Sequence, residues 1–445
     1  NLSQTALDAM GHFYTYPPSQ PSGNKLSATL FFLCNGRSEE YGAAESIFAD
    51  IWKSGYNTLL NINYFLKSME GSTAVIGSNN KDVLMGEAYG LRAYLHFDLF
   101  RLFGPRWEDR SNINKILPYS RTTDMILNHV GYEEDVYSTA DEYLDYLLED
   151  IREAERLLAA DPILSDDSAI SKELISDFYK NRNRRMNYYA VKALLARVYL
   201  WGGDRTLAYA TAIEILKAVR DSGTELFPFV TNAAATSSST PDRVFSTEVL
   251  FGCYNSSRGT IHETLFAPTL ETAKILTFAG TLNSGRVEEL YDDKNDYRYK
   301  IWATYNNNGN SVLYHRKYED FEDNSGTRTY RYMVPLIRLS EVYLIAAECC
   351  DDLDEAVGYL NTLRNARNCF SVYPTVDGLK NYIASEYRKE MLGEGQMFFF
   401  YKRKEIVNIP NGTQASGTMN VELNKYVVPL PDSETSQRTN TDTSK

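Results

Sequence analysis

The sequence predicts a mainly α-helical protein that carries one irregular, partly β segment. Apolar residues recur at three- and four-residue steps through residues 48–222 and again through 334–410, which is the period of helices that bury one face. Between residues 223 and 333 that period mostly disappears, and turn-forming Ser, Thr and Asn take its place. The 445 residues, of which 43% are apolar, are enough for one large core or two ordinary ones.

Residues 48–103 predict two helices. Apolar and aromatic residues follow the helical period through 52–66 and through 84–102, and residues 71–80 interrupt it. Gly104-Pro105 ends the second helix, because proline has no N–H to donate.

Three further helices are expected before the irregular segment. One begins after Thr139, whose spacing to Glu142 fits a capping box, and ends before Pro162. The next two are predicted over about 187–201 and 205–220. No apolar stretch along the chain approaches the ~20 residues that a membrane-spanning helix needs.

The last two of these helices have the alternation of small and large residues that is typical of a tetratricopeptide hairpin. The residues concerned are Leu195, Ala196, Tyr199, Gly203, Ala208 and Ala212. A weaker copy occurs at 337–366. Two diverged copies favour packed helix pairs rather than a regular repeat array.

Tyrosine is unusually frequent, since 33 Tyr outnumber 20 Phe and 4 Trp together. Many lie in the irregular segment, beside strand-like runs at 249–251 and 312–314. They are Tyr291, Tyr297, Tyr299, Tyr305, Tyr314, Tyr318, Tyr330 and Tyr332, with Trp302 among them. Each aromatic is open to two interpretations: ordinary core, or a flat platform on which sugar rings stack while nearby amides and carboxylates bond hydroxyls.

No catalytic or metal-binding pattern is present. The five histidines are scattered, the five cysteines lack metal-ligand spacing and are interpreted as free thiols, and Gly393-Glu-Gly395 is only a G-x-G in a charged helical run. A net charge of −13 disfavours nucleic acid. The number of carboxylates does not exclude the catalytic carboxylate pair of a glycosidase. Pairs such as Asp292-Asp293 are nevertheless interpreted as solvated loop charges.

Several strings resemble one family in the right order along the chain. They are Gly86-Glu-Ala88 with Leu91-Arg-Ala93-Tyr94, Phe103-Gly-Pro105, Glu248 to Phe251, Arg338 with Glu341 and Tyr343-Leu344, Leu360-Asn361 with Arg364, and Arg388 to Gly395. Together they resemble the SusD/RagB-like outer-membrane nutrient-binding lipoproteins. The chain departs from the family's pattern at Met397 and Phe400, where many members have Arg and Asp.

The resemblance implies one domain over residues 1–445, a superhelix of tetratricopeptide-like pairs in which 48–222 and 334–410 form the scaffold and 223–333 a ligand-binding insertion. It implies a protein that is not an enzyme, needs no cofactor or metal, and captures glycan or peptide at the bacterial cell surface for a SusC-like TonB-dependent transporter. It also implies a lipid anchor on an N-terminal cysteine. Because the chain begins at Asn1, we expect that segment to have been removed.

Within this family the motif residues Glu87, Arg92, Glu341 and Arg364 are expected to form buried ion pairs that orient helices. The ligand is expected in the loops instead. The predicted stacking residues are Trp302, Tyr305, Tyr299, Trp107 and Tyr41, and the predicted hydroxyl-binding residues are Arg37, Asn306 and Asp296. A peptide-binding relative, a glycoside hydrolase and an adhesion protein remain alternatives.

Overall fold

The structure is a computed structural model that describes residues 2–15, 38–112, 116–123, 137–165, 170, 179–221, 226–271 and 274–435. Its helices are α1 (Leu2–Met10), α3 (Ser38–Met69), α4 (Thr73–Ile76), α5 (Ser78–Phe103), α6 (Ala140–Leu157), α7 (Tyr188–Trp201), α8 (Arg205–Asp221), α9 (Asn232–Ala235), α10 (Arg258–Leu265), α11 (Arg286–Leu290), α12 (Leu339–Cys349), α13 (Leu353–Ala366), α14 (Val376–Glu390), α15 (Met397–Lys404) and α16 (Asp432–Thr435). The mainly α-helical fold class is confirmed.

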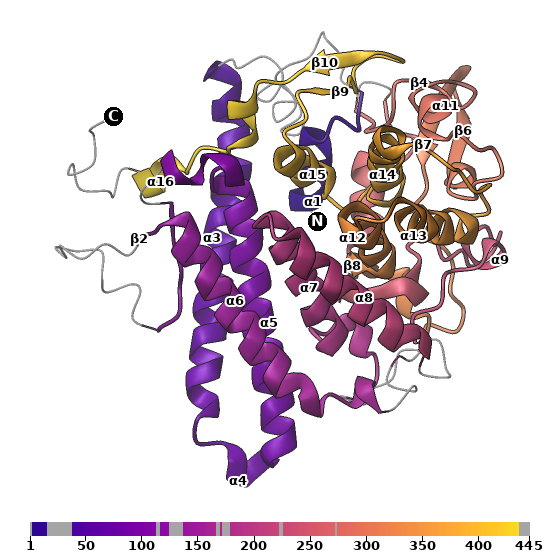
Figure 1. The fold of residues 1–445 in the computed structure, drawn as a ribbon. Coiled ribbons are helices and arrows are strands. Elements are labelled where there is room, and N and C mark those ends of the chain that lie inside the picture. Colours follow the sequence, from indigo (N-terminus) through magenta and orange to yellow (C-terminus); the bar gives the residue numbers. More distant parts are fainter. Residues whose placement is uncertain are drawn as a thin grey trace.

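The long helices α3 and α5 stand side by side and are joined at one end by α4 (Figure 1). Beyond them α5 packs on α6, α6 on α7, α7 on α8 and α8 on α12. Gly86 and Gly90 of α5 permit this close packing. A Cβ on Gly86 would lie 2.7 Å from Leu158, and a Cβ on Gly90 would lie 2.6 Å from Met186. The successive helix pairs therefore approach through residues that leave no room for a side chain.

The predicted helix boundaries are close to those of the structure. Thr139 caps α6 through both halves of the expected capping box. Asn187 caps α7, its side chain accepting from Ala190 N–H. The weaker hairpin copy begins later than predicted, because residues 333–338 form a strand and α12 starts only at Leu339.

Strands occur only as antiparallel pairs in the part of the chain that the structure describes. The pairs are β1 (Leu117–Pro118) with β2 (Tyr137–Ser138), β3 (Val249–Tyr254) with β8 (Met333–Arg338), β4 (Gly280–Thr281) with β5 (Ser284–Gly285), β6 (Trp302–Asn307) with β7 (Asn310–His315), and β9 (Asn408–Pro410) with β10 (Thr418–Asn420). The pairing of β3 with β8 joins a strand within the irregular segment to the strand at its C-terminal end. This segment also contains α9, α10 and α11, which the sequence did not predict.

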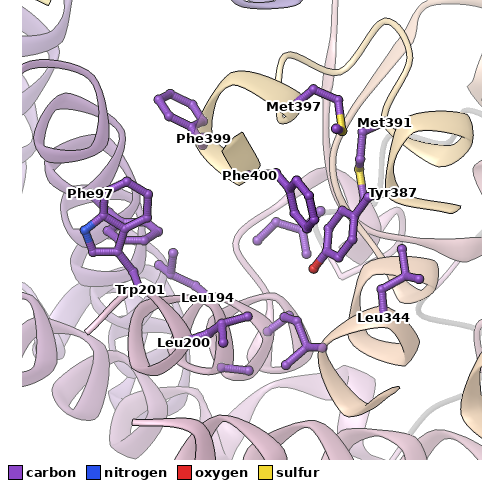
Figure 2. Packing of buried hydrophobic residues seen from close by; sticks show 14 of the residues in the cluster. Phe97, Leu194, Leu200, Trp201, Leu344, Tyr387, Met391, Met397, Phe399 and Phe400 are labelled. Atoms are coloured by element: carbon purple, nitrogen blue, oxygen red, sulfur yellow. The ribbon is translucent and has the colours of Figure 1, made fainter. Parts of the chain in front are cut away.

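One large apolar cluster connects the two halves of the chain. It runs from α1 to Val428 and includes Phe278, Trp302 and Leu313 of the irregular segment. Part of it is shown in Figure 2, where Met397 and Phe400 lie near Tyr387 of α14. At the two positions where many members of the family have Arg and Asp, this chain therefore has buried apolar side chains, 1% and 5% exposed.

The four motif charges form the expected buried ion pairs. Glu87 pairs with Arg182 and Arg185, Arg92 with Asp150, Glu341 with Arg197, and Arg364 with Glu386 and Asp292. Gly393-Glu-Gly395 is not helical, in contrast to the prediction: it follows α14 as a turn in which both glycines have positive φ, +82° and +70°. None of the described helices is both long and apolar enough to span a bilayer.

Candidate functional site

The β6–β7 hairpin holds the centre of the predicted ligand site. Its tip is Asn308-Gly309, with φ of 52° and 89°, the residue types that a two-residue hairpin turn favours. The side chain of Asn306 accepts a hydrogen bond from Gly309 N–H at 2.8 Å and so stiffens the tip. Tyr305 lies beside this turn and is 43% exposed.

Trp302 is a correction to the prediction, because it is only 4% exposed. Its ring packs against Phe278 and His315, with centroid separations of 4.5 and 4.6 Å, and its Nε1 donates to the Tyr291 hydroxyl at 3.4 Å. Side chains alternate between the two faces of a strand, so Trp302 and Tyr305 point in opposite directions. Trp302 belongs to the core, and Tyr305 is the aromatic residue of β6 that is exposed, together with its neighbours Thr304 and Asn306.

Asp296 is also buried and is unavailable to a ligand in this structure. It is 0% exposed, and its carboxylate accepts from the Arg298 guanidinium at 2.6 to 3.1 Å. Tyr299 is half-buried, and its hydroxyl donates to Leu282 O at 3.1 Å. The ammonium of Lys294 lies 4.5 Å from the centroid of the Tyr299 ring and makes a cation–π contact with it.

The remaining predicted residues do not join the hairpin. Trp107 lies at the α7–α8 turn, where a Cβ on Gly203 would be 3.7 Å from its ring, and the Arg110 guanidinium is 4.4 Å from its centroid. The side chain of Tyr41 and the whole of Arg37 fall outside the described residues. Of the predicted set, the structure places Tyr305 and the neighbouring Asn306 on the hairpin, whereas Tyr299 lies before β6 and Trp107 lies at the α7–α8 turn.

Two strongly exposed aromatics were missed by the sequence reasoning. Phe370 is 74% and Tyr373 86% exposed on the loop between α13 and α14. A signal was available in the sequence, because both residues lie between Asn368 and Pro374 and outside any helical period. Aromatic residues in a turn between two helices are not explained by helix packing.

The α13–α14 loop is held firmly despite its exposed side chains. Asn361 bonds both backbone groups of Val372 at 2.8 Å, and the Arg364 Nε donates to Phe370 O at 3.2 Å. Asp293 accepts from Phe370 N–H at 2.7 Å. We call Tyr305 on the hairpin together with Phe370 and Tyr373 the aromatic loops.

A cluster of mostly buried charges lies between the irregular segment and the helices α13 and α14. It contains six cations and six acids: Arg298, Lys317, Arg338, Arg364, Arg367 and Lys389 with Glu248, Asp292, Asp296, Glu386, Glu390 and Glu394. We call this set the buried charge cluster. Asp292, expected to be a solvated loop charge, belongs to it through Arg364 and Lys389. The cluster joins the irregular segment to α13 and α14, and through Arg364 it contacts the loop that carries Phe370.

The titration behaviour of the carboxylates does not favour acid–base chemistry at this surface. Burial alone would raise the pKa of Asp292, but Lys389 and Arg364 hold it at about 2. The carboxyls with raised pKa values are Asp8, at about 7, and Asp242, at about 6, and burial is the main cause for both. Asp8 lines a cavity of about 30 Å³, which is too small for a sugar ring. In the described part of the chain no group of three or more His, Cys, Asp or Glu residues could hold a metal ion.

Comparison with known proteins gives a consistent picture. A family model described as the SusD family matches residues 169–443, and one described as starch-binding associating with outer membrane matches residues 23–165. No curated protein matches.

Similar solved structures share the fold at low sequence identity. A SusD-like carbohydrate binding protein from Bacteroides vulgatus is 17% identical, with 98% of this chain and 90% of that chain covered and a TM-score of 0.69. A SusD superfamily protein from the same species is 22% identical over 98% and 93%, with a TM-score of 0.66. Surface glycan-binding protein A from Bacteroides thetaiotaomicron is 17% identical over 87% and 82%, with a TM-score of 0.59. The chain belongs to the SusD family.

Proposed function

We propose that this protein binds glycan at the bacterial cell surface without chemically changing it. The observation that carries the proposal is the match to two family models over 23–165 and 169–443, one of them described as starch-binding. Solved proteins of similar fold include a carbohydrate binding protein and a surface glycan-binding protein. Near the α13–α14 loop, Asp292 is ion-paired with Arg364 and Lys389 and Asp293 accepts from Phe370 N–H, which supports a site that binds and does not catalyse.

The aromatic loops have the chemistry that glycan binding requires. Exposed aromatic rings offer flat apolar faces to the C–H groups of sugars, and amides at their edges bond hydroxyls. Tyr305 lies next to Asn306, and Phe370 lies beside the loop of Asp293 and Asn295. Because both loops are held by hydrogen bonds, little conformational entropy is lost on binding.

The wider setting is part of the same proposal. Family membership supports a position at the outer membrane, a lipid anchor on a cysteine outside this chain, and delivery of the ligand to a SusC-like TonB-dependent transporter. Co-purification of the anchored protein with such a transporter from outer membranes would support this setting. Recovery of the protein without any transporter would contradict it.

Calorimetry with starch-type and other oligosaccharides tests the site. Tyr305→Ala and Tyr373→Ala should each weaken binding by about 3- to 10-fold, the loss expected for one aromatic stacking contact. Tyr64→Ala is the matched control, because Tyr64 is 53% exposed but lies on α3. Affinity equal to that of the unmodified protein in both loop variants would remove the aromatic loops from the site.

Two alternatives have distinct outcomes in the same experiment. A peptide-binding relative would bind peptides from a library and none of the glycans. A glycoside hydrolase would release reducing ends from a polysaccharide with multiple turnovers. Binding of a glycan without such release supports the proposal.

A further inference from the structure

A second cavity lies in the interior, on the helical scaffold and not at the aromatic loops. It has a volume of about 30 Å³, enough for one or two water-sized groups, and is enclosed by α5, α7, α12, α14 and α15. Its apolar lining includes Leu200, Trp201, Tyr387 and Phe400, all visible in Figure 2. Its polar lining is mostly cationic, with Arg101, Arg197 and Arg403 against the single acid Glu341.

Arg101 contributes a donor that has no acceptor among the described residues. Its guanidinium carbon lies 4.7 Å from the centroid of the Phe97 ring and 4.0 Å from that of Phe399. Its Nη1 donates to Gln396 Oε1 at 3.0 Å and its Nη2 to Asp98, but its buried Nε has no partner. The residue is 3% exposed, so water outside the protein cannot bond this N–H.

Arg197 contributes a second such donor to the same lining. Its Nε donates to Glu341 Oε1 at 2.8 Å, and its Nη2 donates to the other oxygen of Glu341 and to Leu336 O. Its Nη1 is buried and has no acceptor within the described chain, and the residue is 5% exposed. Trp201 Nε1 is also unpartnered there, but in Figure 2 it lies on the ring edge away from Phe400, so the two arginines define the site.

The nearby acceptors each already accept a hydrogen bond from an arginine. Both oxygens of Glu341 accept from Arg197, and the oxygen of Gln396 accepts from Arg101. Both oxygens of Glu348 accept from Arg403. A water molecule in the cavity would have to share such acceptors for its own two hydrogens, whereas an anion needs only donors.

We propose that this cavity binds a small monovalent anion of the chloride type, held by Arg101 Nε and Arg197 Nη1. The anion bridges Arg101 of α5 and Arg197 of α7, and these two arginines in turn contact Phe399 of α15 and Glu341 of α12. The anion therefore stabilises the contact between the two parts of the helical scaffold, residues 48–222 and 334–410. The site is independent of the proposed glycan binding.

Crystals grown in sodium bromide test the site directly. An anomalous bromide peak within hydrogen-bonding distance of both Arg101 Nε and Arg197 Nη1 is the expected result. Ordinary density for water with no anomalous signal would overturn the proposal.

Thermal unfolding provides a second readout in solution. Replacing gluconate by chloride at constant ionic strength should raise Tm by about 2 °C once chloride exceeds its Kd several-fold. Arg101→Lys keeps the charge but removes the unpartnered N–H, and its Tm should no longer respond to chloride. Arg156→Lys, on the exposed side of α6, is the control that should retain the response. An Arg101→Lys protein as responsive as the control would contradict the assignment.

Discussion

The helical scaffold that precedes the irregular segment, residues 48–222, and the irregular segment itself, residues 223–333, depend to different degrees on apolar packing and on buried charges. In the scaffold, neighbouring helices bury continuous apolar faces, and residues such as Leu194 and Ala196 are 0% exposed. In the irregular segment, smaller apolar clusters are supplemented by the buried charge cluster. A helix satisfies its own backbone and needs only an apolar partner, whereas a segment of turns and short strands needs specific side chains to position it.

The largest loss of stability is expected when one charge is removed from the buried charge cluster. Glu390 binds three arginines, Arg298 and Arg338 at 2.6 Å and Arg367 at 2.7 Å. Glu390→Gln should cost about 3–5 kcal/mol of the free energy of unfolding, because it leaves buried arginines without a counter-charge. Urea unfolding measures the loss.

Two reference variants make that result informative. Leu194→Ala in α7 should cost about 2–5 kcal/mol through a cavity, and should leave the charge cluster intact. Glu289→Gln, whose carboxylate is half-exposed and pairs with Arg286, should cost less than about 1 kcal/mol. If Glu390→Gln cost no more than Glu289→Gln, the cluster would not hold the segment in place.

Acid should weaken the cluster in a defined pH range. Burial alone would raise the pKa of Glu386, but Arg298, Lys389 and Arg364 hold it at about 2, below its value of 4.5 in an unfolded chain. A lowered carboxyl pKa stabilises the fold above about pH 4.5, and this stabilisation is lost as pH falls toward 2. Relative to the unmodified protein, Glu386→Gln should be about 3 kcal/mol less stable at pH 7, and the difference should close near pH 2.

Comparing the two proteins at each pH removes the contribution of other groups. Burial lowers the pKa of His96 in the scaffold to about 3, and this histidine destabilises both proteins equally in acid. A stability difference between the two proteins that stayed constant from pH 7 to pH 2.5 would show that Glu386 is not held ionised by its neighbours.

The smallest expected effect concerns the scaffold alone. Thr139→Ala removes the capping box of α6 and should cost about 1 kcal/mol. Thr58→Ala, at an exposed interior position of α3, should be neutral or slightly stabilising because alanine is the better helix former. Equal unfolding midpoints for the two variants would mean that the cap does not stabilise the protein.

The sequence predicted the scaffold better than the site for a physical reason. Helix positions and the cap at Thr139 depend on residues three or four apart, so a single sequence shows them. Trp302 and Tyr305 have the same local composition, yet one is 4% and the other 43% exposed. The register of β6 against β7 and the position of Phe278 decide that difference, and neither is visible in the spacing of aromatics.

The acidic residues show the same limit. Asp292 and Asp296 resemble loop charges in sequence, but both pair with cations in the structure. The partners of Arg298 on α14 lie 88 and 92 residues away. No local pattern links residues so far apart, and the motif charges were assigned only because the family resemblance implied their role.

By itself the sequence determined the helical class, the order and limits of the main helices, and membership of the SusD family, because these depend on local periodicity and on strings of adjacent residues. The tertiary structure decided which aromatics are core and which are exposed, which charges form the buried cluster, and where Arg101 and Arg197 meet. Burial and ion pairing depend on which distant segments are brought together, and that is a property of the folded chain as a whole.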